Sequence, residues 1–139
     1  IHFRHGAGKD VHAPGFYVHV SPTDNFIALG MWRPEPPILL AVRTKMAEDP
    51  ARWSKTVAAK ALAKVGLELG MGDKLSRVPK GFDKDHPLAD ELKRTSFVMS
   101  SQLTAKDITT KGFVDFVAAR FAAGKDFMRY LCEAAGVPY

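Results

Sequence analysis

The chain has 139 residues, 46% of them hydrophobic and 10% aromatic, which is the size and apolar content of one ordinary globular domain. This composition excludes disordered and fibrous proteins, and the longest apolar runs, Phe26 to Trp32 and Ile38 to Val42, are too short to span a membrane. The formal net charge of +5 is compatible with nucleic acid as a partner. However, acidic and basic residues are interleaved along most of the chain, which is typical of a solvated surface. This distribution argues against nucleic-acid binding.

Cysteine usage and the first residues bear on the location of the protein. Cys132 is the one cysteine, which excludes an internal disulfide, and residues 1–5 have no apolar core of the kind that a secretory signal carries. We therefore expect a soluble, cytoplasmic protein without a membrane segment. Because Gly6 to Asp10 resemble a linker, we expect residues 1–13 to form a flexible connector that follows an earlier part of a longer chain.

The first regular element is predicted to be an antiparallel hairpin over residues 16–32. Phe16 to Val20 and Phe26 to Trp32 are rich in strand-forming residues, and Ser21 to Asn25 between them has turn chemistry. Gly30 interrupts the second strand, which predicts a bulge or a close approach by another backbone.

Helices are predicted after the hairpin. The prolines after Trp32 preset a helix start, and residues 37–47 carry an apolar stripe that Arg43 interrupts. A short helix follows Asp49-Pro50, and Gly66 to Gly70 has the pattern of a short strand. Further on, the sequence predicts a helix over 87–95 and a strand at Phe97 to Met99. Thr104 is predicted to cap a short helix. An amphipathic helix is predicted over 111–135, and Gly124 could divide it.

These elements predict an α+β fold in a single domain over residues 1–139. An antiparallel sheet that includes the hairpin over 16–32 would be covered by the helices near 37–47, 87–95 and 111–135.

The charged loop before the third predicted helix is the main candidate for a ligand site. Arg77 and Lys80 flank a proline, Gly81 permits close backbone approach, and His86 precedes a helix start whose free amides favour anions. The spacing is not that of a P-loop, in which lysine directly follows the second glycine. The alternative is that Arg77 and Lys80 pair with nearby aspartates and hold a long connection in place.

Two more residues are candidates for contact with a ligand. Trp32 beside Arg33 offers an aromatic platform at a strand end, although core packing is the commoner role. Arg43 places a guanidinium on an otherwise apolar helix stripe. No metal site is expected, because the histidines near the amino end have no helix-spaced pair and no nearby cysteine; they are His2, His5, His12 and His19.

Several motifs taken together resemble a known family. They are Gly30-Met31-Trp32-Arg33-Pro34-Glu35-Pro36, Arg77-Val78-Pro79-Lys80-Gly81-Phe82 and His86-Pro87, followed by the phenylalanine-rich terminal helix. In this order they resemble a conserved family of bacterial and fungal proteins catalogued only as a domain of unknown function (DUF2461). The resemblance covers essentially the whole chain. It implies a longer protein, with a helical region and a basic segment before residue 1, and it brings no known catalytic residue, substrate or cofactor.

Three functions therefore stay open. The first is binding of a small anionic ligand, phosphate or nucleotide-like, by Arg77, Lys80, Gly81 and His86, with Trp32 or Arg43 nearby. The second is an enzyme of hydrolase or phosphoryl-transfer type in which His86 or Asp85 is the acid or base. The third is a structural or self-associating protein, a possible homo-oligomer, with residues 32–40 as its apolar contact surface. The pattern identifies no catalytic residue and no cofactor.

Overall fold

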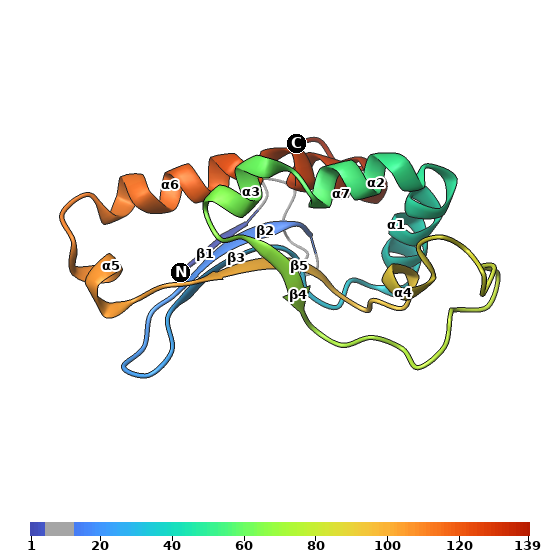
Figure 1. Cartoon of the computed structure of the whole chain (residues 1–139), viewed down its shortest axis with the longest axis horizontal. Coiled ribbons are helices and arrows are strands. Elements are labelled where there is room, and N and C mark those ends of the chain that lie inside the picture. The colour runs from blue at the N-terminus through green and yellow to red at the C-terminus, as the bar shows by residue number, and fades with distance from the viewer. Residues whose placement is uncertain (5–12) are drawn as a thin grey trace.

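The computed structural model describes residues 1–4 and 13–139 and confirms the α+β class. Its sheet has the strand order β1-β2-β3-β5-β4, and every neighbouring pair is antiparallel (Figure 1). The strands are β1 (His2–Arg4), β2 (Gly15–His19), β3 (Phe26–Met31), β4 (Glu68–Met71) and β5 (Phe97–Gln102). The predicted hairpin is therefore confirmed as β2 and β3, and β5 lies against β3 rather than at an edge.

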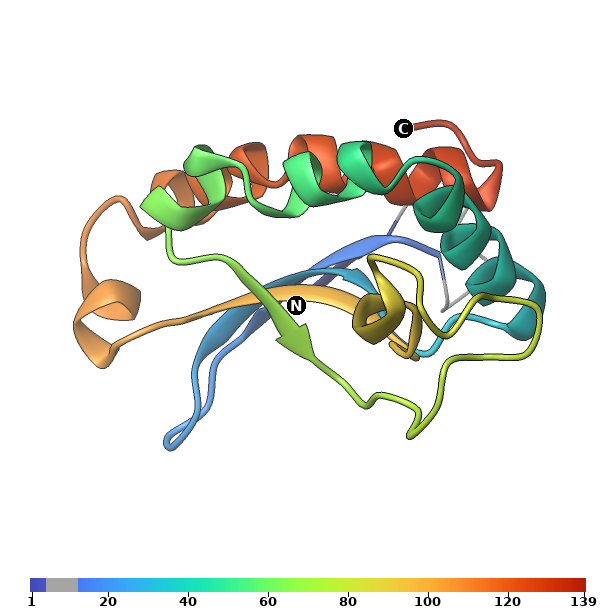
Figure 2. The same ribbon diagram turned by 45° about the vertical axis from the view of Figure 1, so that its right-hand side comes forward.

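Most helices lie over one face of this sheet, and the short helices α4 and α5 lie at its two ends (Figures 1 and 2). The helices are α1 (Pro36–Glu48), α2 (Pro50–Val57), α3 (Lys60–Lys64), α4 (Ala89–Leu92), α5 (Ala105–Thr109), α6 (Phe113–Ala123) and α7 (Lys125–Ala135). The predicted helix near 37–47 is confirmed as α1, with proline in its first turn. The predicted cap at Thr104 is a reciprocal capping box with Asp107 at the start of α5.

Alternation along the central strands places the core between the sheet and the helices. Ile27, Leu29 and Met31 of β3 are fully buried and face the helices, as Phe97 and Met99 of β5 do. They pack in one hydrophobic cluster with Trp53 of α2 and with apolar residues of α1, α6 and α7. The part of the chain that the structure describes places no helix over the opposite face of the sheet (Figure 2).

Gly30 shows why β3 and β5 can lie so close together. Its φ is 136°, and a Cβ atom there would lie 2.0 Å from the carbonyl oxygen of Phe97. Only glycine tolerates both conditions. The predicted close approach by another backbone is therefore confirmed.

Two predicted helices differ from the structure. The helix expected over 87–95 is shorter and consists of α4 alone. Before α4 the chain forms a turn, in which the His86 side chain accepts a hydrogen bond from Leu88 N at 2.9 Å. After α4 the chain pairs with the segment that follows β4. Leu75 N donates to Lys93 O at 2.7 Å there. The helix expected over 111–135 begins only at Phe113, while the division that the sequence suggested at Gly124 is confirmed; a Cβ there would lie 2.7 Å from Leu29 Cδ1.

The expected connector over residues 1–13 also differs where the structure describes it. His2–Arg4 forms the edge strand β1, in which Phe3 lies opposite Phe16 and contacts the ring of Phe121 at 6.3 Å between centroids. Backbone pairing and this aromatic contact order residues that local composition had assigned to a connector. Residues 5–12 lie outside the described residues. No helix among those described is long and apolar enough to cross a membrane.

Candidate functional site

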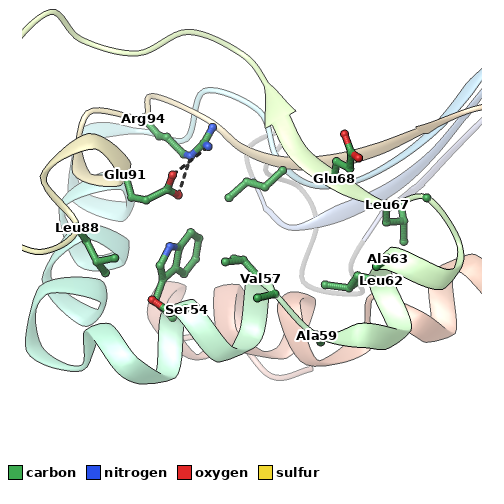
Figure 3. Close-up of a pocket in the computed structure, with 14 residues that line it drawn as sticks. Ser54, Val57, Ala59, Leu62, Ala63, Leu67, Glu68, Leu88, Glu91 and Arg94 are labelled. Atoms are coloured by element: carbon green, nitrogen blue, oxygen red, sulfur yellow. Dashed lines mark hydrogen bonds and ion pairs between the residues drawn. The ribbon is translucent and has the colours of Figure 1, made fainter.

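A hollow lies between α2, α3, β4 and the segment around α4 (Figure 3). Its volume is about 600 Å³, within the usual range for small-molecule pockets. Most of its wall is apolar, contributed by Val57, Ala59, Leu62, Leu67, Leu69 and Leu88. Hydrophobic contact with the body of a small molecule is therefore available over most of this cavity.

An ion pair forms the polar part of the cavity wall. Arg94 donates from Nε and Nη2 to the two carboxylate oxygens of Glu91, at 2.9 and 3.1 Å (Figure 3). Arg94 is 8% exposed, and its Nη1 has no partner among the described residues. The guanidinium is therefore held in a fixed orientation while part of its donor capacity stays unused.

Arg43 lies next to Arg94 in the interior. Its Nη2 donates to the carbonyl oxygen of Arg94 at 2.9 Å, and its Nε is buried without a partner in the described part of the chain. Burial lowers the pKa of the Arg43 guanidinium, because removal from water disfavours its charged form. Arg43 is not among the residues that line the cavity, whose charged side chains are Arg94, Glu68 and Glu91.

Trp53 of α2 lines the same cavity and connects it to the core. Its ring packs against Tyr130 at 5.3 Å and edge-on against Phe97 at 5.8 Å between centroids. The indole Nε1 is buried and has no hydrogen-bond acceptor among the described residues. Such a donor costs roughly 1–3 kcal/mol of stability, and Trp53 is fully buried, so its main role here is in the core.

His86, the candidate acid or base, binds the backbone on both sides of its ring. Nδ1 accepts from Leu88 N at 2.9 Å, which assigns the proton to Nε2, and Nε2 donates to Ala47 O at 3.1 Å. These bonds attach the charged loop to the end of α1, one helical turn from Arg43. In this arrangement both ring nitrogens are engaged, so His86 gives no support to a role in proton transfer.

The other loop candidates lie apart from Arg43. Arg77, Lys80 and Gly81 are exposed, and neither Arg77 nor Lys80 forms an ion pair with a described residue. Gly81 has a φ of 97° and open space where a Cβ would be, so it serves a turn here. Free cations on an exposed loop can still attract an anion, but the structure does not place them at the cavity.

Trp32 lies on the opposite, uncovered face of the sheet. It lines a shallow hollow of about 250 Å³ with Tyr17, Phe26 and Met71, and none of the other expected ligand residues belongs to that hollow. The guanidinium of Arg33 lies 5.5 Å from the Trp32 ring centroid. The Trp32 ring and the Arg33 guanidinium therefore lie close together, on a different face of the sheet from Arg43.

Three residues of the cavity were missed by the sequence reasoning, namely Trp53, Glu91 and Arg94. The spacing of Glu91 and Arg94 permits an ion pair on a helical turn, which is a signal of pairing but not of a site. The cavity itself depends on β4 lying opposite α2 and α3, which no local pattern predicts.

The comparisons with known proteins agree with the resemblance read from the motifs. A family model described as a conserved hypothetical protein (DUF2461) matches residues 1–130. The chain belongs to this family. No curated protein and no solved structure shows significant similarity to it.

The cavity of this DUF2461 protein combines apolar and polar groups. The wall offers an apolar surface, a hydrogen-bond donor on Arg94, and a carboxylate, Glu91, that is already bound to Arg94. Such a set can recognise an acceptor-bearing ligand without further groups.

Proposed function

We propose that this domain binds a small molecule with an anionic end and an apolar body in the cavity between α2, α3, α4 and β4. The observation that carries the proposal is the pairing of an apolar hollow with a guanidinium, that of Arg94, whose Nη1 has no partner among the described residues. A ligand that supplies an acceptor to Arg94 would complete this wall.

One guanidinium of the wall supports an anionic end. Arg94 lines the cavity and is 8% exposed, so water screens its charge poorly, and its Nη1 is left over from the pair with Glu91. The proposed ligand is still the anion that the sequence predicts, but its proposed site is the cavity and not the loop of Arg77 and Lys80. The exposed loop residues would then contribute to attraction at a distance rather than to direct contact.

The test uses a variant that fills the cavity without changing the core. Ala63 lines the cavity and is exposed, whereas Ala61 is exposed on the same helix and does not line it. Ala63→Phe should therefore block the ligand, and Ala61→Phe is a matched control with the same change in helix propensity. Replacing Trp32 with Phe in both leaves Trp53 as the one tryptophan, so its fluorescence reports on the cavity.

The measurement is a fluorescence titration of these variants with a panel of small organic anions. We expect saturable binding to the parent and to Ala61→Phe, and at least a tenfold loss of affinity in Ala63→Phe. Binding that is equal in the two alanine variants would show that the ligand lies elsewhere. An absence of binding by every anion would contradict the proposal.

A second candidate function, self-association, is favoured by two exposed apolar side chains in the expected contact region. Trp32 is 41% exposed and Leu40 is 55% exposed. Exposed large apolar residues are common contributors to interfaces between copies. Light scattering across a concentration series tests this function, and a monomer at all concentrations would contradict it.

A further inference from the structure

We infer that a second hollow, between α2 and α7, binds the phosphate group of a small polar molecule. This hollow has a volume of about 380 Å³, and its lining consists of Arg52, Lys55, Thr56, Ala59, Asp126 and Arg129. The first four residues come from α2 and the segment after it, and the last two come from α7. The site goes beyond the proposed function, because the cavity beside β4 shares only Ala59 with it.

The charged residues of this lining leave an excess of two positive charges. Of the described residues that line the hollow, Arg52, Lys55 and Arg129 are basic and Asp126 is acidic. A phosphate monoester carries about 1.5 to 2 negative charges at neutral pH, which matches this excess. Charge complementarity therefore favours a phosphate group over a cation and over an anion with a single charge.

Charged residues just outside the lining do not remove this excess. Glu133 accepts from Arg52 Nη2 at 2.7 Å, but it also accepts from Lys45 Nζ at 2.9 Å, so Lys45 and Glu133 balance each other. Asp49 caps the start of α2 and does not line the hollow. The bond to Glu133 engages one nitrogen of Arg52, and the other two have no hydrogen-bond partner among the described residues.

The other two basic side chains are also available to a ligand. Lys55 has no ion pair in the described part of the chain. Arg129 Nη1 lies 3.4 Å from Asp126 Oδ1, and these side chains are 49% and 70% exposed, so an anion can compete for this contact. Guanidinium groups match the oxygens of phosphate in shape as well as in charge. Two guanidinium groups and one ammonium group therefore provide the donors of the site.

The lining indicates that the rest of the ligand is polar. Ala59 is its one apolar residue in the part of the chain that the structure describes, whereas the cavity beside β4 is lined mainly by leucine, valine and alanine. A hollow of about 380 Å³ lies in the usual range for small-molecule pockets, so it has room for more than a phosphate ion. The ligand class is therefore a phosphate monoester with a hydroxyl-bearing body rather than a lipid phosphate.

Isothermal titration calorimetry with inorganic phosphate tests this site at about pH 8, where phosphate is largely a dianion and the basic side chains keep their charge. Lys55→Gln and Arg129→Gln each remove one charge of the lining. Lys106→Gln removes an equal charge from the exposed surface of α5, which lies at the other end of the molecule (Figure 1).

We expect saturable binding of phosphate to the parent. Each lining variant should lose affinity by about fivefold or more, which is the effect of one unit charge at about 4 Å in water. The control should lose less than about twofold at an ionic strength of about 0.1 M, because salt screens distant charges. Far-ultraviolet circular dichroism checks that each variant is folded. Losses in Lys55→Gln and Arg129→Gln no greater than that of the control would overturn the inference.

Asp126→Asn should change the affinity in the opposite direction. The substitution removes the negative charge of the lining and releases Arg129, so phosphate should bind about threefold more tightly or better. A site for a cation would lose affinity in the same variant. Weaker binding of phosphate to Asp126→Asn would therefore contradict the assignment of the hollow to an anion.

Two phosphate monoesters test the body of the ligand. Glycerol phosphate should bind at least as tightly as inorganic phosphate, and butyl phosphate should gain nothing from its alkyl chain, because the lining offers little apolar surface. Butyl phosphate that binds more tightly than glycerol phosphate would overturn the polar body.

The outcomes are distinguishable from those for the cavity beside β4. Ala63 does not line the hollow between α2 and α7, so Ala63→Phe should leave phosphate binding unchanged. Loss of phosphate binding in Ala63→Phe would place the anion in the other cavity, which overturns this inference and supports the proposed function. An absence of saturable phosphate binding to the parent, with organic anions still bound in the Ala63-dependent manner, would overturn the second site alone.

Discussion

Several charged or titratable side chains of this protein hold the backbone or the helices of distant segments in place. His86 links the charged loop to α1 through Ala47, and Arg43 links α1 to the segment after α4 through the carbonyl of Arg94. Lys45 of α1 and Arg52 of α2 meet Glu133 of α7 at 2.9 and 2.7 Å. At this scale the residue types were visible in the sequence, but their partners were not.

Replacement of His86 should destabilise the fold measurably. His86→Ala removes two hydrogen bonds to the backbone, and we expect a loss of about 1–3 kcal/mol in the free energy of unfolding. His86→Asn retains a side-chain acceptor two residues before Leu88 and should lose about half as much. Urea unfolding measures both, with Lys84→Ala as an exposed control on the same loop. A loss no greater than that of the control would show that these bonds contribute nothing to stability.

The Glu133 ion pairs should make stability depend on pH in a defined direction. Hydrogen bonds from Lys45, and then from Arg52, lower the pKa of the Glu133 carboxyl below its usual value near 4.5. A lowered pKa in the folded state contributes stability that is present above that value and is lost as the pH falls through the folded pKa. Because the site is partly exposed, we expect Glu133→Gln to cost only about 0.5–1 kcal/mol at neutral pH.

Denaturant unfolding from pH 7 down to the acid range provides the test. The difference between Glu133→Gln and the parent should shrink as the pH falls below the usual value near 4.5 and then through the lowered pKa of the carboxyl. Glu48→Gln, on the exposed part of α1 and without an ion pair among the described residues, is the control. A difference that stays constant with pH would assign the effect to packing rather than to charge.

At the scale of elements, the sheet depends on the contact between β3 and β5. Gly30 of β3 lies opposite Val98, with the backbone of β5 where a side chain would be. Gly70 of β4 has no heavy atom within 4 Å of the corresponding position. A methyl group added at Gly70 therefore meets open space, whereas one added at Gly30 overlaps the backbone of β5.

Gly30→Ala should destabilise the protein by about 3 kcal/mol or more, because the added methyl group overlaps the Phe97 carbonyl and the backbone angle is unfavourable. Gly70→Ala should change stability by less than about 1 kcal/mol. Thermal or urea unfolding distinguishes the two. Similar stabilities for both variants would mean that β3 and β5 can separate at little cost, contrary to the geometry.

At the scale of the molecule, one hydrophobic cluster joins the sheet to the helices of the covered face. Trp53, Leu29 and Phe127 belong to it, from α2, β3 and α7 respectively. Helices and strands that are far apart in the sequence therefore bury apolar side chains against one another. The single domain predicted from the length of the chain leads to a testable expectation about unfolding.

We expect one cooperative transition when the protein is unfolded by urea. Far-ultraviolet circular dichroism reports on the helices and sheet, and Trp53 fluorescence in the Trp32→Phe background reports on the core. The two curves should coincide, as they do for most small domains. Separate midpoints would indicate two units that unfold independently and would contradict the single-domain prediction.

The sequence alone determined the elements whose signals are local. Alternation and turn residues identified the hairpin, prolines identified the start of α1, and Thr104 with Asp107 identified the capping box, because each signal acts within a few residues. Gly30 was correctly interpreted as a close approach, although its partner strand was not named. The motifs also led to the family that the comparison then showed.

Only the tertiary structure decided the length of α4, the strand at His2–Arg4 and the composition of the cavity. Pairing with distant segments shortened α4 and ordered β1, and such contacts override local propensity. The cavity brings Trp53, Leu67 and Arg94 together from three parts of the chain. Their proximity results from how the sheet and helices pack, and no spacing between residues in the sequence encodes it.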